Sequence, residues 1–188
     1  MANKPGKQED CETYVNRSSN WKNMLRSDQN STVQGFDTGF NGFLQPKYEN
    51  GSWGERDPAM SSPTSSPNSC LFNDAIYFTD RLSFLHFSNL VNIGDHQAFP
   101  PVYQFHYTGR PGLSTQRARA HIDTSFNGTI SGIPGDEDSG AMGSFVVFTM
   151  LSIWPVLGED VYLLSPPAFS DNWISHDFFT EGSVLEFT

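Results

Sequence analysis

The stretch Gly132-Ile133-Pro134-Gly135-Asp136-Glu137-Asp138-Ser139-Gly140-Ala141-Met142 is the most informative part of this chain. Three acidic side chains stand in a row between glycines, and a long apolar run follows them from Ala141 to Leu157. The spacing of the apolar residues in that run predicts a buried helix over about 139–153. We therefore expect the carboxylates on a tight loop at a helix N-terminus, where the helix dipole and free N–H groups favour the ionised form.

Ionised carboxylates in such a loop suit a general base or a cation ligand rather than a proton donor. The alternative interpretation is structural, because Asp138 or Ser139 could cap the first turn of the helix. The residues alone leave both interpretations open.

The composition bounds the class of protein. The chain has 188 residues, and 14% of them are aromatic, which indicates a buried interior and one sizeable domain. A net charge of −10 argues against a nucleic-acid partner, because phosphate contacts need basic patches. No apolar run reaches the length of a membrane span. Two cysteines, Cys11 and Cys70, are too few for a disulfide scaffold or a structural zinc site.

The N-terminus bears on localisation. Residues 1–10 are polar and lack the apolar core of a secretory signal peptide, so a cytosolic location is the default expectation. Four Asn-x-Ser/Thr sequons point instead to a secreted ancestor; they begin at Asn16, Asn30, Asn50 and Asn127.

Hydrophobic periodicity predicts several helices. One is expected at 74–90, with Ile76, Leu82 and Leu85 on a common face. The other expected helices are a short one over 14–26, one that follows the break at Pro100-Pro101 and runs through Tyr107, and one from a capping Ser114 to about His121.

The remaining segments are expected to be loops or strands. Residues 1–10 are predicted to form a loose tail, and residues 27–69, rich in Ser, Asn, Gly and Pro, to form long loops with brief extended pieces. After Pro155, apolar or alternating runs at 161–164 and 184–187 predict strands.

The acidic loop also belongs to a longer pattern of blocks in a fixed order. Gly-x-Pro-Gly-Asp-Glu-Asp-x-Gly-x-Met is followed by an aromatic-rich helix and then by a Pro-Val pair. The other blocks are Tyr14–Trp21 with Arg-Ser-Ser-Asn-Trp, Gly39–Trp53, Val102–Pro111 and Asp160–Pro167. Together they resemble glycoside hydrolase family 92, the calcium-dependent, inverting exo-α-mannosidases, and most closely its fungal branch.

This resemblance implies a mainly α fold. The family's catalytic domain is an (α/α)6 barrel between β-sandwich elements, and this chain can supply only an incomplete barrel fragment with long loops and a few C-terminal strands. The implied division is a tail at 1–10, a partial catalytic domain at 11–158 and the start of a C-terminal β-sandwich at 159–188. A block that the family carries between Asn73 and Asp80 is missing here.

The resemblance also implies roles for individual residues. Inverting hydrolysis needs one carboxyl group that protonates the leaving oxygen and another that activates water. The family's base loop maps onto Asp136 and Asp138. Its acid motif, Gly-(Asn/Asp)-Glu-Pro-x-Phe, reads Gly94-Asp95-His96-Gln97-Ala98-Phe99 here, so His96 stands at the acid position. Histidine can donate a proton, with an ordinary pKa near 6.5, but hydrogen-bond reach limits general-acid catalysis strictly. The alternative interpretation of His96 is a polar loop residue.

Substrate and cofactor expectations follow from the same resemblance. Arg17, Asn20, Trp21 and Glu137 are the implied substrate-binding residues, and mannose-containing glycans are the implied partners. Aromatic residues could stack on sugar rings or belong to the core; they are Trp21, Trp53, Tyr103, Phe105 and Tyr107. Calcium would be held by loop oxygens, although the missing block leaves the ligand set incomplete.

The expected function is that of an α-1,2-mannosidase, acting ancestrally on N-glycan or mannan chains. Activity is expected to be impaired, because His96 replaces the acid and barrel segments are missing. The alternatives are a non-catalytic remnant that binds glycan or a partner protein, and a fragment produced by an incorrect gene prediction.

Overall fold

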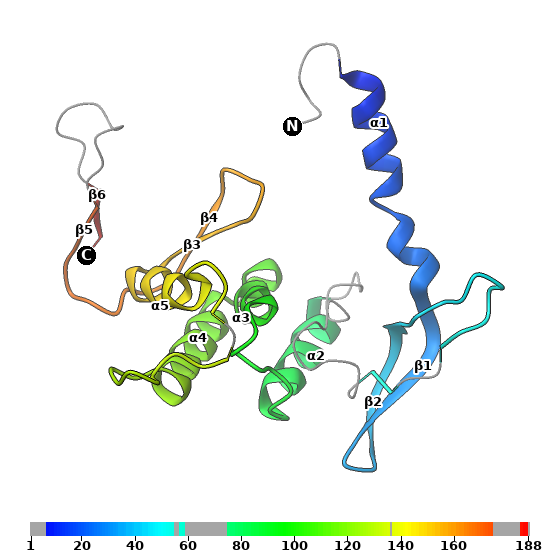
Figure 1. The fold of residues 1–188 in the computed structure, drawn as a ribbon, viewed down its shortest axis with the longest axis horizontal. Helices are drawn as coiled ribbons and strands as arrows, with labels where there is room; N and C mark the ends of the chain where they lie inside the picture. The colour runs from blue at the N-terminus through cyan, green and yellow to red at the C-terminus, as the bar shows by residue number, and fades with distance from the viewer. Residues whose placement is uncertain (1–6, 55–56, 59–74, 136, 175–184, 188) are drawn as a thin grey trace. The chain divides into compact units, whose positions relative to one another are not determined.

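The computed structural model describes residues 7–54, 57–58, 75–135, 137–174 and 185–187 (Figure 1). The chain divides into two compact units, Met1–Pro63 and Thr64–Thr188, and each is described by itself. The described part is rich in helices and has a few short strands, which confirms the mainly α class.

The first unit begins with a solvent-exposed helix. Helix α1 spans Gln8–Arg17, and a 3-10 helix, η1, spans Asn20–Met24. Acidic residues in the first turn of α1 and Arg17 in its last turn complement the helix dipole. The predicted helix over 14–26 is wrong in extent, because α1 starts earlier and the chain enters a strand at Leu25. Residues 8–10, predicted as tail, are helical.

A β-hairpin follows where the sequence predicts mostly loops. Strands β1 (Leu25–Val33) and β2 (Phe36–Leu44) pair antiparallel. Gln34 and Gly35 form the two-residue turn with φ of 52° and 83°, and positive φ at both positions matches the twist of a hairpin. The prediction of mostly loops is wrong for these two strands, because polar residues of β1 donate hydrogen bonds to a carboxylate group.

Asp57 supplies that carboxylate. One of its oxygens accepts a hydrogen bond from Ser31 Oγ at 2.7 Å, and the other accepts from Thr32 N at 3.0 Å and Thr32 Oγ1 at 2.7 Å. Charge-assisted hydrogen bonds of this kind are stronger than neutral ones. They hold a polar strand that has little apolar surface of its own.

The second unit packs short helices around two apolar clusters. Its elements in chain order are α2 (Ala75–Phe87), η3 (His96–Ala98), α3 (Phe99–Tyr103), η4 (Gln104–Thr108), α4 (Pro111–Ser125) and α5 (Ala141–Leu151). The larger cluster contains Phe99, Val102 and Tyr103 of α3, Ala118 of α4 and Phe145 of α5. The smaller one joins Phe78 and Leu82 of α2 to Phe105 of η4.

Several helix predictions are confirmed and several need correction. The helices at 74–90 and 139–153 are present as α2 and α5, but Ile76 is 73% exposed and does not share the buried face of Leu82. Pro100 and Pro101 do not break the chain but lie in the first turn of α3, which begins at Phe99, because proline fits the first turn of a helix. Ser114 is buried inside α4, which starts at Pro111, so it caps nothing.

Two short β-pairs complete the described chain. Strand β3 (Ile153–Pro155) pairs antiparallel with β4 (Tyr162–Leu164), and β5 (Asn172–Ile174) pairs antiparallel with β6 (Leu185–Phe187). The strands predicted at 161–164 and 184–187 are therefore present.

Three side chains hold the segment that begins with β4 by binding its main-chain carbonyl groups. His106 Nε2 lies 2.9 Å from Leu164 O, and Ser152 Oγ donates to Pro166 O at 2.8 Å. Arg119 Nη2 donates to Pro166 O and Pro167 O, each at 2.9 Å. We call these three side chains the carbonyl clamp. Arg119 of α4 therefore binds main-chain carbonyl groups of its own chain.

Candidate functional site

Two glycines let the acidic loop cross the segment that contains His96. A Cβ atom added at Gly135 would overlap the carbonyl group and Cα of Gly94, and Gly135 has a φ of +66°. In the other direction, a Cβ at Gly94 would lie 3.0 Å from the Gly135 Cα. Only glycine fits such a close approach together with positive φ. The crossing therefore fixes the two predicted catalytic loops against each other.

The crossing brings His96 and Asp138 into contact. His96 Nδ1 lies 3.5 Å from Asp138 Oδ2, and the two side chains are 37% and 69% exposed. Water and salt screen so exposed a pair, so its contribution to stability is small. Its importance is chemical, because the residue at the acid position touches a candidate base.

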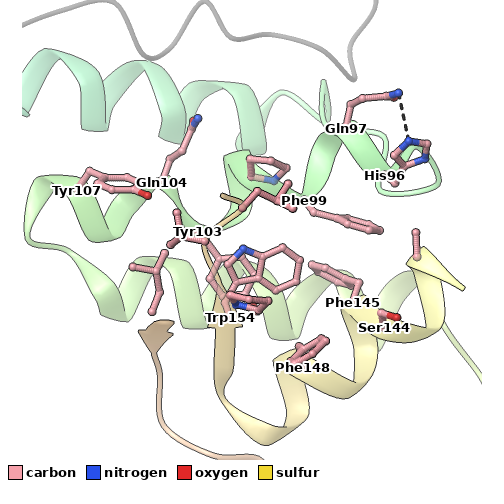
Figure 2. A pocket seen from close by; sticks show the side chains of 16 residues that line it. His96, Gln97, Phe99, Tyr103, Gln104, Tyr107, Ser144, Phe145, Phe148 and Trp154 are labelled. Atoms are coloured by element: carbon pink, nitrogen blue, oxygen red, sulfur yellow. Dashed lines mark hydrogen bonds between the residues drawn. The ribbon is translucent and has the colours of Figure 1, made fainter. Parts of the chain in front are cut away.

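Gln97 and Asp95 hold His96 from the other side. Asp95 Oδ1 accepts from Gln97 N at 3.2 Å, which caps η3, and the Gln97 amide lies 3.4 Å from His96 Nε2 (Figure 2). With its amide nitrogen turned toward Asp95, Gln97 donates to that carboxylate and offers its oxygen to His96. Both ring nitrogens of His96 then face oxygen atoms that can accept a hydrogen bond.

Glu137 caps helix α5. Its Oε1 accepts from Met142 N at 3.2 Å and its Oε2 accepts from Gly143 N at 3.3 Å. The structural interpretation, in which a residue of the acidic loop caps the helix, is therefore confirmed. The capping residue, however, is Glu137 and not Asp138 or Ser139. The N-cap position is Gly140, and no side chain at that position forms the cap. Asp136, the other base candidate, lies outside the described residues.

The other predicted substrate residues belong to the first unit. Arg17 and Asn20 are exposed at the end of α1 and the start of η1. Trp21 is half-buried, and Lys22 Nζ lies 5.8 Å from its ring centroid. In the second unit, the structure brings His96 into contact with Asp138, the chain neighbour of Glu137.

The aromatic residues divide between core and surface. Tyr103 and Phe105 are buried core residues, whereas Tyr107 is 67% exposed. Trp53 lies under Lys47, whose Nζ is 4.6 Å from the ring centroid. Burial raises the pKa of Tyr103 to about 12, although its hydrogen bond to Thr149 Oγ1 at 2.7 Å opposes the shift. Tyr103 therefore stays protonated at neutral pH.

An aromatic pocket next to His96 is a feature that the sequence does not reveal. Its volume is about 680 Å³, and residues of η3, α3, η4, α5, β3 and β4 line it. Tyr103 stacks on Trp154 with ring centroids 4.4 Å apart, and Phe99 stacks on Phe145 at 4.5 Å. Helical spacing marks Phe99 and Tyr103, or Phe145 and Phe148, only as residues of one face. The pocket depends on long-range contacts with Trp154.

Neither a cluster of metal ligands nor a membrane-spanning helix is found among the described residues. Among the described residues, no three His, Cys, Asp or Glu side chains gather as metal ligands would. In the same part of the chain, no helix combines the length and the apolar character needed to cross a bilayer.

Comparison with known proteins settles the family. The model of the glycosyl hydrolase family 92 catalytic domain matches residues 1–84 and 71–188, which together cover the whole chain. The chain belongs to glycosyl hydrolase family 92. This result confirms the resemblance drawn from the acidic loop and its companion blocks.

A relative of this family 92 chain is an uncharacterized secreted glycosidase from Arthroderma benhamiae. The two are 34% identical over 245 residues, which include 94% of this chain and 32% of the relative. The chain thus spans about a third of the length of that relative. No solved structure matches the chain. Because the relative is described as secreted, the comparisons give no support to the cytosolic default.

The two family matches overlap at 71–84, and the region aligned with the relative is longer than this chain of 188 residues. The relative therefore has residues within that region that this family 92 chain lacks.

Proposed function

We propose that this chain is a divergent family 92 glycosidase, derived from an inverting α-1,2-mannosidase of N-glycan or mannan chains, and that it has little activity on its own. The contact between His96 and Asp138 is the main support. It joins the residue at the acid position to a base candidate in a geometry that differs from the one the reaction needs.

Inversion requires room for water between the two catalytic groups. The carboxyl groups of inverting glycosidases are about 6.5–9.5 Å apart, so that water can attack the face opposite the leaving group. Here 3.5 Å separates His96 Nδ1 from Asp138 Oδ2, which leaves no such space between these atoms. If Asp138 is the base, its contact with His96 opposes catalysis. Asp136 stays the second base candidate, and Arg17, Asn20, Trp21 and Glu137 stay the proposed substrate residues.

An incomplete barrel is the second part of the proposal. The two overlapping family matches and the longer aligned region of the relative support a missing block near 71–84. The proposed catalytic fragment is 11–158, followed by the start of a β-sandwich at 159–188.

Calcium dependence rests on the family resemblance alone. Calcium takes about six to eight oxygen ligands, and the described residues do not fit that need, because no three candidate side chains gather.

An assay of the purified chain tests the proposal of low activity. On α-1,2-linked mannobiose, with calcium or with a chelator, we expect turnover far below the roughly 10 s⁻¹ of a typical enzyme. Turnover near that value would contradict it.

Repair of the acid motif tests the residue roles. His96→Glu with Gln97→Pro, in a longer chain that regains the missing block, should restore hydrolysis with inversion at the anomeric carbon. Adding Asp138→Asn should abolish it, because an amide cannot take a proton from water. NMR of the first-formed sugar anomer reports the stereochemistry. Retention, or full activity after the Asp138→Asn substitution, would show that the base is misassigned.

A non-catalytic binding protein is the second candidate. The replacement of the acid by His96 favours it, because glycan binding does not need the missing proton donor. Calorimetric binding of mannobiose without turnover would distinguish it from a weak enzyme. An intact reading frame for the missing block in the genomic sequence around Asn73 and Asp80 would identify an incorrect gene prediction instead.

A further inference from the structure

The pocket beside His96 has a volume suited to a small ligand. Its roughly 680 Å³ lies within the range of about 300–1,000 Å³ that is usual for ligand pockets. Rings form much of its wall: Tyr103 stacks on Trp154, and Phe145 meets Trp154 edge-on with centroids 5.7 Å apart. Such walls favour a flat aromatic ligand, which can stack on one ring and meet another at its edge.

The polar groups of the pocket are few, and four of them lie toward its ends. Figure 2 shows His96 and Gln97 at one end, Gln104 and Tyr107 at the other, and Trp154 between them. The hydroxyl group of Tyr103, in the middle, is already bonded to Thr149. Ser144 and the indole N–H of Trp154 are the other polar groups of the lining, so a sugar ring buried here would replace few of its hydrogen bonds to water, and each one lost costs free energy.

The position of His96 indicates which part of a substrate the pocket would hold. It stands at the position of the acid that protonates the leaving oxygen, so under the proposed function the pocket lies on the leaving-group side. We propose that the pocket binds an aromatic group bonded to oxygen, the phenol or aryl leaving group of a glycoside, with its ring against Trp154 and its oxygen toward His96. This inference rests on the proposed function for the direction of the ligand, but binding of the free phenol does not require hydrolysis.

Calorimetric titration of the full chain with 2-naphthol tests the proposal. We expect saturable binding of one molecule per chain. Methyl α-D-mannoside, which has no aromatic group, should not compete. Absence of saturable naphthol binding, or displacement of naphthol by the mannoside, would overturn it.

Matched variants locate the binding. Ser144 lines the pocket from α5 and is exposed, so Ser144→Trp should occupy the pocket and weaken naphthol binding about tenfold or more. Val147→Trp places the same side chain on the same helix at a 55% exposed position outside the lining, and it should change affinity less than twofold. Circular dichroism checks that both variants are folded.

A second pocket variant covers the case in which Ser144→Trp does not fold. Leu157 lines the pocket and is 92% exposed, so Leu157→Asp should fold and also weaken binding. Equal binding by wild type and by every folded pocket variant would contradict the proposal. A chain that self-associates in light scattering and binds no naphthol would show that a second copy covers the pocket. Mannobiose has no aryl group, so its hydrolysis tests the proposed function separately.

Discussion

At the scale of single residues, Glu137 holds the start of α5 through both carboxylate oxygens. We expect Glu137→Ala to lower the free energy of unfolding by roughly 0.5–1 kcal/mol, since the side chain is exposed and a cap of this kind is worth about that much. Urea denaturation measures the change. Glu159→Ala removes an exposed acidic residue beyond α5 and is the control. Equal effects of the two substitutions would show that the cap contributes nothing.

His86 is a buried histidine with an altered pKa. Its Nε2 lies 3.3 Å from Pro101 O, and its Nδ1 lies 3.3 Å from His121 Nε2. Burial, followed by the nearby His121 and Arg117, lowers the pKa of His86 to about 4, against the hydrogen bond to Pro101. Burial and Arg117 also lower the pKa of His121. Both histidines are therefore neutral in the folded chain at neutral pH.

Acid should destabilise the fold through His86. The unfolded chain takes up a proton near pH 6.5, while folded His86 resists it down to about pH 4. The contribution is thus complete above pH 6.5 and is lost as pH falls toward 4, by about 3 kcal/mol in total. His86→Phe should flatten the pH dependence of the unfolding free energy in that window. Val147→Ala, at an exposed position without a titratable group, should leave that slope unchanged. An unchanged slope in His86→Phe would refute this assignment.

At the scale of elements, the crossing of Gly94 and Gly135 can be tested with a matched glycine. Gly135 and Gly140 have φ of +66° and +80°, but only a Cβ at Gly135 meets another part of the chain. Both alanine substitutions incur the cost of positive φ, about 1 kcal/mol, and Gly135→Ala adds the overlap with Gly94. Urea denaturation should therefore show a larger loss for Gly135→Ala. Equal losses would mean that the loops separate freely.

The elements that sequence reasoning located best are those with strong local patterns. The run from Met142 to Leu151 is apolar enough to predict α5, and the glycines and carboxylates before it predict a tight loop. The hairpin could not be predicted in this way. Strand β1 is polar, and it is held by Asp57, more than twenty positions along the chain.

The candidate site, like the fold, was predictable from the sequence only in part. The sequence, through the family resemblance, identifies His96 and Asp138, but their contact depends on a backbone crossing that no local pattern describes. Glu137, which stays a proposed substrate residue, also caps α5, and the sequence pointed to Asp138 or Ser139 for that role. The stacking of Tyr103 on Trp154 joins residues about fifty positions apart, so the pocket was not predictable.

At the scale of the whole molecule, the chain covers 32% of its relative, and the second unit exposes apolar side chains. They include Val147, Leu157, Tyr162 and Leu164. Exposed apolar patches favour association, so we expect the isolated chain to be marginally stable. Calorimetry should show a broad transition, and light scattering should show self-association. A sharp cooperative melt of a monomer would contradict this expectation.

The carbonyl clamp bears on how freely this protein's sequence can drift. His106, Ser152 and Arg119 grip oxygens that every amino acid has, so the grip does not depend on the identity of Leu164, Pro166 or Pro167. Neutral substitutions can accumulate in the held segment while its path stays the same. Selection to keep this segment in place therefore acts on the three side chains of the carbonyl clamp. A lineage that loses Arg119 loses two of the four contacts at once.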